Sequence, residues 1–268
     1  MRRSALPILI VACTVVAAIL AWLVTQRLFH GPGAEETSGP VTSELRTPGT
    51  FTKLDISGRA DIELVQGPRH EVAVEATPGH QDRIRTRVEG STLIVSTDGH
   101  SGWRPFRGPG RTPRIVITAP TLETVALAGA LRLKAGTLDV PALRIAASGA
   151  TNVKIDALKT DALRFAGSGA VKAELAGQAS DLTLSLSGAG DVRAAQLLSE
   201  AAKVSVSGAG KVVVNASKTL RVSLSGAGSV EYLGNPEVKQ SVSGIGRVKR
   251  RDGGDSAPAK TVLQVALA

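Results

Sequence analysis

Ser205-Val-Ser-Gly-Ala-Gly210 is the stretch that decides the fold, because closely similar segments recur along the chain. Three near copies are Ser185-Leu-Ser-Gly-Ala-Gly190, Ser223-Leu-Ser-Gly-Ala-Gly228 and Ser241-Val-Ser-Gly-Ile-Gly246, and weaker copies contain Gly129, Gly149 and Gly169. The first glycines of the copies therefore stand at positions 129, 149, 169, 188, 208, 226 and 244, at steps of 18 to 20 residues. Such a regular period is typical of proteins that stack one structural unit many times.

Apolar and polar positions alternate on both sides of this glycine. Four residues before it stand Val125, Ile145, Phe165, Leu184, Val204, Val222 and Gln240. Two residues before it stand Leu127, Ala147, Gly167, Leu186, Val206, Leu224 and Val242, and four residues after it stand Leu133, Val153, Ala173, Val192, Val212, Val230 and Val248. A period of two is that of a β-strand. Each unit therefore predicts two short strands joined at a glycine corner, where the chain must turn sharply.

A strand pair of this length cannot bury its apolar face alone, so we expect successive units to stack as parallel coils around one thin core. Connections between parallel strands are strongly right-handed. The sequence therefore predicts an all-β fold, a right-handed parallel β-helix (β-solenoid) with coils of 18–20 residues over residues 49–250. A left-handed helix of hexapeptides would fit the shorter steps, but no period of six residues is visible.

The segments that flank the repeats complete the predicted organisation. Residues 51–66 show the same pattern, with Gly58 as the corner, and further alternating strands are predicted at residues 71–76, 84–88, 93–96 and 114–118. We expect these strands to form the first coils and to cap the rod. Residues 31–48 are rich in Gly, Pro, Ser, Thr and Glu and predict a flexible linker. Residues 251–268 predict a disordered C-terminal tail.

The composition of the chain limits its core and its partners. Hydrophobic residues make up 43% of the 268 residues but aromatic residues only 3%, so the core must consist of Val, Leu, Ile and Ala. The formal charge of +9 favours anionic partners. The only cysteine, Cys13, lies in an apolar N-terminal stretch, so the remainder of the chain contains neither a disulfide nor thiol chemistry.

Residues 1–30 predict a signal anchor with a transmembrane helix. Arg2 and Arg3 precede an uncharged stretch from Ala5 to Val24, and these 20 residues match the hydrocarbon core of a bilayer. The two arginines favour an N-terminus in the cytoplasm. We therefore expect a bacterial inner-membrane anchor, with the solenoid in the periplasm or outside the cell, and this location argues against nucleic acid as the partner.

Two other interpretations of the N-terminus stay open. A cleaved secretory signal would release the protein, although no clear small-residue cleavage site follows Val24. The segment Leu9-Ile-Val-Ala-Cys13 resembles a bacterial lipobox, although mostly apolar residues continue beyond the cysteine.

Three features together resemble one bacterial family, the "putative auto-transporter adhesin, head GIN domain". They are the pattern F-x-x-L-x-I-x-G-x-x-D-I-x-L-x-Q over residues 51–66, the segment Gly90-Ser-Thr-Leu-Ile-Val95 and the recurring Ser-Gly-Ala-Gly corners. The resemblance spans about residues 48–250. It implies a right-handed β-helix and an exported or surface location, and it brings no catalytic residues with it.

No catalytic or metal-binding pattern in the sequence is convincing. The histidines at positions 30, 70, 80 and 100 have no Cys or His at ligand spacing. The Gly-Ala-Gly segments lack the Lys-Ser/Thr and the helix of a phosphate loop. Because some parallel β-helices cleave polysaccharides, Asp61 and Asp191, three residues after their corner glycines, are candidate acids. No second acid beside Asp191 is evident, and we expect it to form a ladder with Lys172 and Lys211. The sequence predicts no enzyme and no cofactor.

A row of cations is the first candidate binding feature. Five residues before the corner glycine stand Thr124, Arg144, Arg164, Thr183, Lys203, Arg221 and Lys239. Stacking in register would align the five cations about 5 Å apart. The row is interpreted either as a solvated face that prevents lateral aggregation or as a site for an anionic glycan or lipid headgroup.

An aromatic and basic loop is the second candidate. Its members are Trp103, Arg104, Phe106, Arg107 and Arg111. The loop could stack on sugars or enter an anionic membrane surface. Alternatively, Trp103 plugs the end of the rod.

The favoured function is a non-enzymatic, envelope-anchored scaffold for adhesion or for binding an anionic glycan or another envelope component. A structural or signalling partner of another envelope protein is the alternative, through the exposed serine columns. An enzyme acting on cell-wall polysaccharide is a distant third hypothesis.

Overall fold

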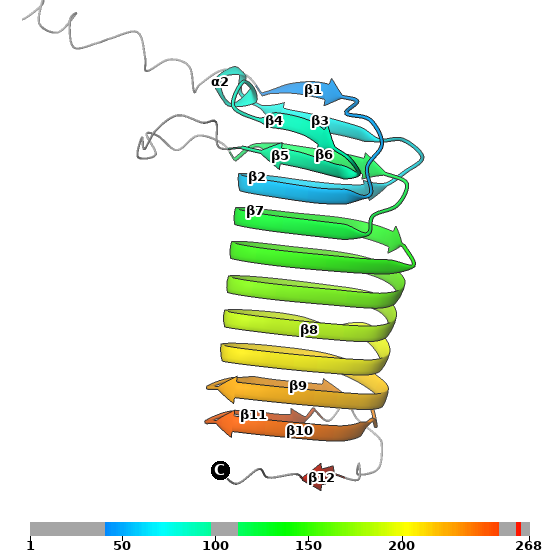
Figure 1. Ribbon diagram of the computed structural model, residues 1–268, viewed down its shortest axis with the longest axis vertical. Helices are drawn as coiled ribbons and strands as arrows, with labels where there is room; N and C mark the ends of the chain where they lie inside the picture. The colour runs from blue at the N-terminus through cyan, green and yellow to red at the C-terminus, as the bar shows by residue number, and fades with distance from the viewer. Residues whose placement is uncertain (1–40, 98–111, 252–260, 264–268) are drawn as a thin grey trace, which may run out of the picture.

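The computed structural model describes residues 41–97, 112–251 and 261–263, and this part of the chain is all-β apart from one short helix (Figure 1). The elements are β1 (Thr42–Arg46), β2 (Lys53–Gln66), β3 (Glu71–Ala76), α2 (Pro78–Gln81), β4 (Arg85–Glu89), β5 (Thr92–Ser96), β6 (Arg114–Ala119), β7 (Thr124–Asp139), β8 (Ala142–Gly226), β9 (Ser229–Leu233), β10 (Glu237–Gly244), β11 (Arg247–Arg250) and β12 (Thr261–Leu263).

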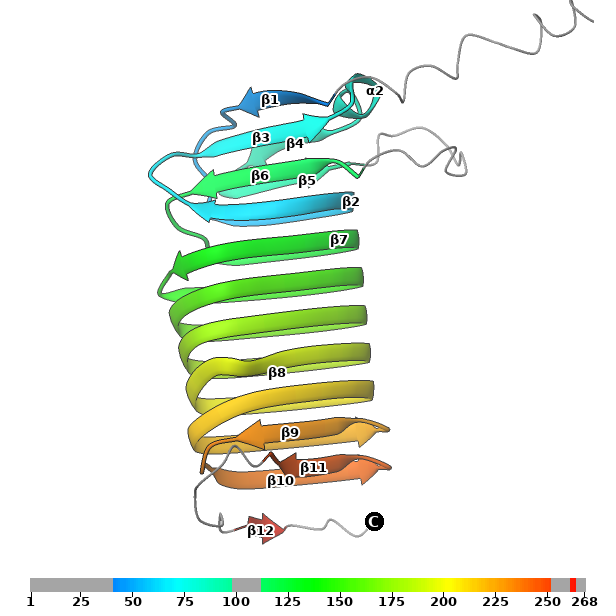
Figure 2. The same cartoon turned by 180° about the vertical axis from the view of Figure 1, so that it is seen from behind.

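The repeats stack in parallel and in register, as the columns predict. Gly58 of β2 lies opposite Gly129 of β7, which in turn lies opposite Gly149 of β8. The long strand β8 winds through several coils, and β10 continues the stack with Gly244 opposite Gly226. Figures 1 and 2 show these coils from the front and from behind, one above the other along the long axis. The corner glycines therefore form one continuous column.

The core is a thin layer of aliphatic side chains inside the coils. Leu186 and Val206 occupy the same position in adjacent coils and are only 4% and 2% exposed. The aromatic Phe165 is buried beside Gly167, whose missing side chain leaves space for Leu186 from the next coil. Val242, at the equivalent position of the last coil, is 42% exposed because no complete coil covers it. The inward columns predicted from the sequence are thus buried until the stack ends.

The first end of the stack differs from the predicted coils. The expected strands exist, and β5 and β6 pair in parallel with β2. However, β4 pairs antiparallel with β5, and β3 pairs antiparallel with both β6 and β1. Only Gly90 and Ser91 separate β4 from β5, and Gly90 has a φ of 60°. So short a turn returns the chain at once and makes a hairpin instead of a coil.

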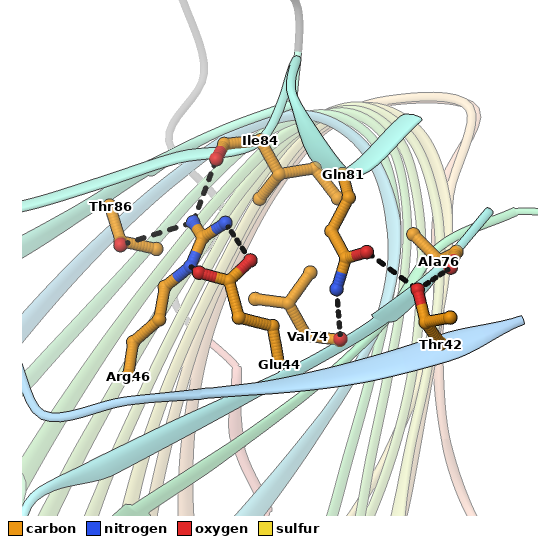
Figure 3. A network of polar contacts seen from close by, with 8 residues as sticks. All are labelled: Thr42, Glu44, Arg46, Val74, Ala76, Gln81, Ile84 and Thr86. Carbon is orange, nitrogen blue, oxygen red and sulfur yellow. Dashed lines mark hydrogen bonds and ion pairs between the residues drawn. The ribbon is translucent and has the colours of Figure 1, made fainter. Parts of the chain in front are cut away.

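Strand β1 lies inside the segment that the sequence assigned to a flexible linker, and Figure 3 shows why it is held. The Arg46 guanidinium donates to the Ile84 carbonyl at 2.7 Å and pairs with Glu44 at 2.8 Å. The Thr42 hydroxyl donates to the Gln81 side-chain oxygen at 2.7 Å. Hydrogen bonding to Arg46 also holds the pKa of Glu44 below its usual value. These contacts fix β1 over the edge of β3, which would otherwise be open.

The C-terminal region also differs from the prediction of disorder, because β12 adds a short parallel strand to β10. Its three residues pair with Val238, Lys239 and Gln240. The predicted transmembrane segment lies outside the described residues. In the part of the chain that is described, no helix has the length and hydropathy needed to cross a bilayer.

Candidate functional site

The basic row lies on the strand that precedes each glycine corner. We use this name for Arg144, Arg164, Lys203, Arg221 and Lys239. Arg144 is opposite Thr124, and Lys239 is opposite Arg221. Within β8 the same register follows from the glycines, since Gly169 lies against Gly149 and Gly208 against Gly188. All five side chains are exposed. Thr183 separates Arg144 and Arg164 from the other three cations.

Most cations of the row form no ion pair. Lys239 pairs with Glu237 at 3.1 Å. The other four cations form no ion pair with any residue in the ranges 41–97 and 112–251. Besides Glu237, three acids lie two or three residues before this column: Asp161, Asp181 and Glu200. Glu200 pairs with Lys218 of the next coil instead, and the two aspartates form no ion pair with another described residue.

The strand after the corner has the opposite character, because most of its cations form ion pairs. Arg132 pairs with Asp61 at 3.3 Å, and Lys211 pairs with Glu231 at 3.2 Å. The predicted ladder of Lys172, Asp191 and Lys211 is wrong in its partners: Lys172 pairs with Glu174 at 3.4 Å, and Asp191 with Arg193 at 2.8 Å. The reason is that residues two apart on one strand face the same way and reach each other as easily as residues on adjacent coils.

Arg193 corrects a second expectation from the sequence. It pairs with both Asp191 and Glu174, so a second acid does lie near Asp191. One guanidinium shared by two partly exposed carboxylates is a surface ion-pair cluster. It lies on the strand after the corner, away from the basic row.

A groove of about 780 Å³ runs beside the basic row across seven coils. Two outward columns of small side chains line it, three residues and one residue before the corner glycine, together with apolar residues and one glycine between them. The first column is Ala126, Ala146, Ala166, Ser185, Ser205, Ser223 and Ser241, and the second is Ala128, Ser148, Ser168, Ser187, Ser207, Ser225 and Ser243. The repeat pattern predicted exposed serine columns but not the groove. The sequence feature that could have predicted the groove is the absence of large outward residues between the cations and the corner glycine.

The groove floor changes along the stack. Alanines dominate the coil of β7 and the first coils of β8, whereas serines occupy both columns from Ser185 to Ser243. Ser148 uses its hydroxyl internally, donating to the Leu127 carbonyl at 3.2 Å. In β2, the coil before the groove begins, the column of Ala126 carries Asp55 instead. The outward columns of the groove thus change from mostly alanine to serine along the stack, and an acidic side chain lies in the coil before the groove.

Other predicted features add no second site in the described part of the chain. Trp103, Arg104, Phe106, Arg107 and Arg111 lie outside the described residues. Within the described ranges, no three His, Cys, Asp or Glu side chains come together as a metal-binding group. His70 packs edge-on against Phe51, with ring centroids 4.8 Å apart.

Residues 50–236 match the family "Putative auto-transporter adhesin, head GIN domain". The chain belongs to this family. The match confirms the resemblance seen in the sequence, and it covers the coils that carry the basic row up to Arg221. No match was found among curated protein sequences.

Solved structures of similar proteins share the fold. A "putative adhesin" from Bacteroides fragilis is 25% identical, with a TM-score of 0.75 over 80% of this chain and 99% of its own. A "putative adhesin" from Parabacteroides merdae is 18% identical, with a TM-score of 0.62 over 80% of this chain and 98% of its own. A "putative lipid binding protein" from Parabacteroides distasonis is 18% identical, with a TM-score of 0.66 over 81% of this chain and 98% of its own.

Proposed function

We propose that this protein is a non-enzymatic scaffold of the bacterial envelope that binds an anionic glycan or another anionic envelope component through the basic row. In this proposal the stacked coils are a right-handed parallel β-solenoid, anchored in the inner membrane by residues 5–24. Membership in an adhesin family supports adhesion or binding as the activity and an envelope or extracellular location.

The observation that carries the proposal is the contrast between the two strands of the coil. Cations after the corner are largely neutralised by nearby acids, whereas four of the five cations in the basic row have no ion-pair partner among the described residues. Stacked like charges on neighbouring strands repel each other. A polyanion laid along the row would relieve this repulsion and gain several charge-assisted contacts at once.

The test reverses two adjacent cations of the row in the full chain, Lys203→Glu with Arg221→Glu. The matched control is Lys134→Glu with Lys154→Glu, which reverses two stacked and exposed cations on the strand after the corner. Both variants change the net charge equally. Binding of the uronic acid polymer polygalacturonate should fall at least tenfold in the first variant and much less in the control.

Added salt should weaken binding by the wild-type protein, because exposed charges are screened beyond about 8–10 Å at physiological ionic strength. Stability should change by less than about 1 kcal/mol in either variant, since exposed charge pairs are weak. Equal losses in both variants would show that only net charge matters, and undiminished binding in the first would leave the row as a solvated face.

A further inference from the structure

We infer that the groove beside the basic row binds a single strand of a linear acidic polysaccharide, extended along the stack and crossing the coils. The inference rests on the proposed function and narrows its ligand class. It assigns to the groove the recognition of the sugar chain, and to the basic row the recognition of its acidic groups.

The shape of the groove favours a long and narrow ligand. It is lined from Ala126 in β7 to Ser243 in β10. Adjacent coils lie about 4.8 Å apart, so six steps between seven coils give a length of about 29 Å. Cations recur along most of this length, in two consecutive coils and then in three. A ligand with one charged headgroup would use only one of these groups, whereas a polymer with an acid on every unit would use both.

The floor combines a mostly apolar surface with a set of serine hydroxyls, and this combination fits a sugar chain, which has both C–H faces and hydroxyls. Eight serines line the groove in its last four coils: Ser185, Ser187, Ser205, Ser207, Ser223, Ser225, Ser241 and Ser243. None of their hydroxyls makes a hydrogen bond to another described residue. Each hydroxyl can donate and accept, which matches the hydroxyls of a sugar. An acyl chain laid there would cover these groups without replacing their bonds to water.

The alanine stretch is compatible with the same ligand. Ala126, Ala146 and Ala166 are partly buried, and they present methyl groups where the later coils present hydroxyls. Sugar rings have apolar C–H faces that can rest on such a floor. Asp55 in the preceding coil would repel an acidic chain, so the ligand is expected to end near β7 and to occupy the coils of β8 and β10.

The test fills the groove without changing its charge. In the full chain, kept in a non-ionic detergent, Ser205→Tyr with Ser223→Tyr should raise the Kd for polygalacturonate at least tenfold. Both side chains point outward in adjacent coils, so the fold should tolerate the change. The control Asn152→Tyr places the same side chain at an exposed outward position after the corner and should leave the Kd unchanged. If the double variant loses thermal stability, Ser187→Tyr, at a fully outward position, replaces it.

Two further ligands separate the outcomes. A neutral linear glucan should bind at least tenfold more weakly than polygalacturonate, and dihexanoyl-phosphatidylglycerol should bind more weakly and be insensitive to the tyrosines. If polygalacturonate binding is lost on reversing Lys203 and Arg221 but not on filling the groove, the inference fails and the proposed function stands. The inference would also fail if only the phospholipid bound and the tyrosine substitutions abolished that binding. Absence of binding to both anionic ligands would overturn the proposed function itself.

Discussion

Gly188 lies so close to Gly169 of the preceding coil that a Cβ at position 188 would be 2.8 Å from the Gly169 carbonyl oxygen. Gly188 also has a φ of 109°, a conformation that L-residues with side chains rarely adopt. The same relationship recurs along the column, for example between Gly226 and Gly208, with 2.7 Å. The glycine column thus allows adjacent coils to approach closely enough to keep the basic row and the groove in register.

Gly188→Ala is therefore expected to destabilise the protein. The positive φ alone should cost about 1–3 kcal/mol, and the approach of Cβ to a backbone oxygen adds to this because a backbone group cannot move aside easily. The matched control is Gly136→Ala, since Gly136 has no positive φ and a Cβ there would meet no atom within 4 Å beyond its chain neighbours. Denaturant unfolding should show a large loss for the first variant and none for the second. Similar values for both would contradict the role of the column.

Leu186 and Ser187 test which side chains point inward. Leu186 is 4% exposed and packs in the core, so Leu186→Ala should cost about 2–5 kcal/mol, and Leu186→Asp should prevent folding. Ser187 is exposed and lines the groove, so Ser187→Ala should cost less than about 1 kcal/mol. Chemical denaturation of both alanine variants checks the assignment, which would be wrong if the two losses were equal.

Arg46 is expected to hold β1 in place over the edge of β3. Arg46→Ala removes the bond to the Ile84 carbonyl and the ion pair with Glu44, so hydrogen exchange in β1 and β3 should increase. Arg85→Ala is the control, because Arg85 is exposed and has no ion pair with another described residue. Unchanged exchange in Arg46→Ala would show that the backbone pairing of β1 suffices.

The same contact predicts a response to acid. Arg46 lowers the pKa of Glu44. A carboxyl with a lowered pKa in the folded state stabilises the fold above its ordinary pKa and loses this contribution as the pH falls through the folded value. After correction for intrinsic rates, exchange in β1 of the wild-type protein should therefore rise as the pH falls below the ordinary pKa of a glutamate. The rise should be smaller in Glu44→Gln, and an equal rise in both would assign it to other groups.

The sequence could predict the coils because the same unit recurs many times, and each copy shows the same pattern of inward and outward positions. The positions of Leu186 in the core and Lys203 outside it follow from a period of two around the corner glycine. The antiparallel cap and β1 could not be predicted in this way, since single short strands carry no signal for the direction of pairing. Arg46 reaches Ile84 across 38 residues, a contact that no local pattern indicates.

The candidate site was only half predictable for a related reason. The basic row is visible in the sequence because charge at a fixed offset is easy to recognise. The groove forms because the side chains beside the long cations are small. In the sequence alone, the columns of Ser205 and Ser207 look like ordinary exposed strand positions. The ion pair of Asp191 with Arg193 was missed because side-chain geometry decides between a partner on the same strand and a partner on an adjacent coil.

The proposed membrane anchor gives the last prediction. The apolar stretch from Ala5 to Val24 contains no charge, so the full chain should stay with the membrane fraction after a carbonate wash. Replacing Val15 and Val16 by lysine should cost about 2.5–3.5 kcal/mol for each residue at the centre of a spanning helix and should release the protein from the membrane. The control Val15→Leu with Val16→Leu should remain bound. N-terminal sequencing should recover the start of the chain, and a mature protein that begins after residue 24 would show that the segment is a cleaved signal and that the scaffold is secreted.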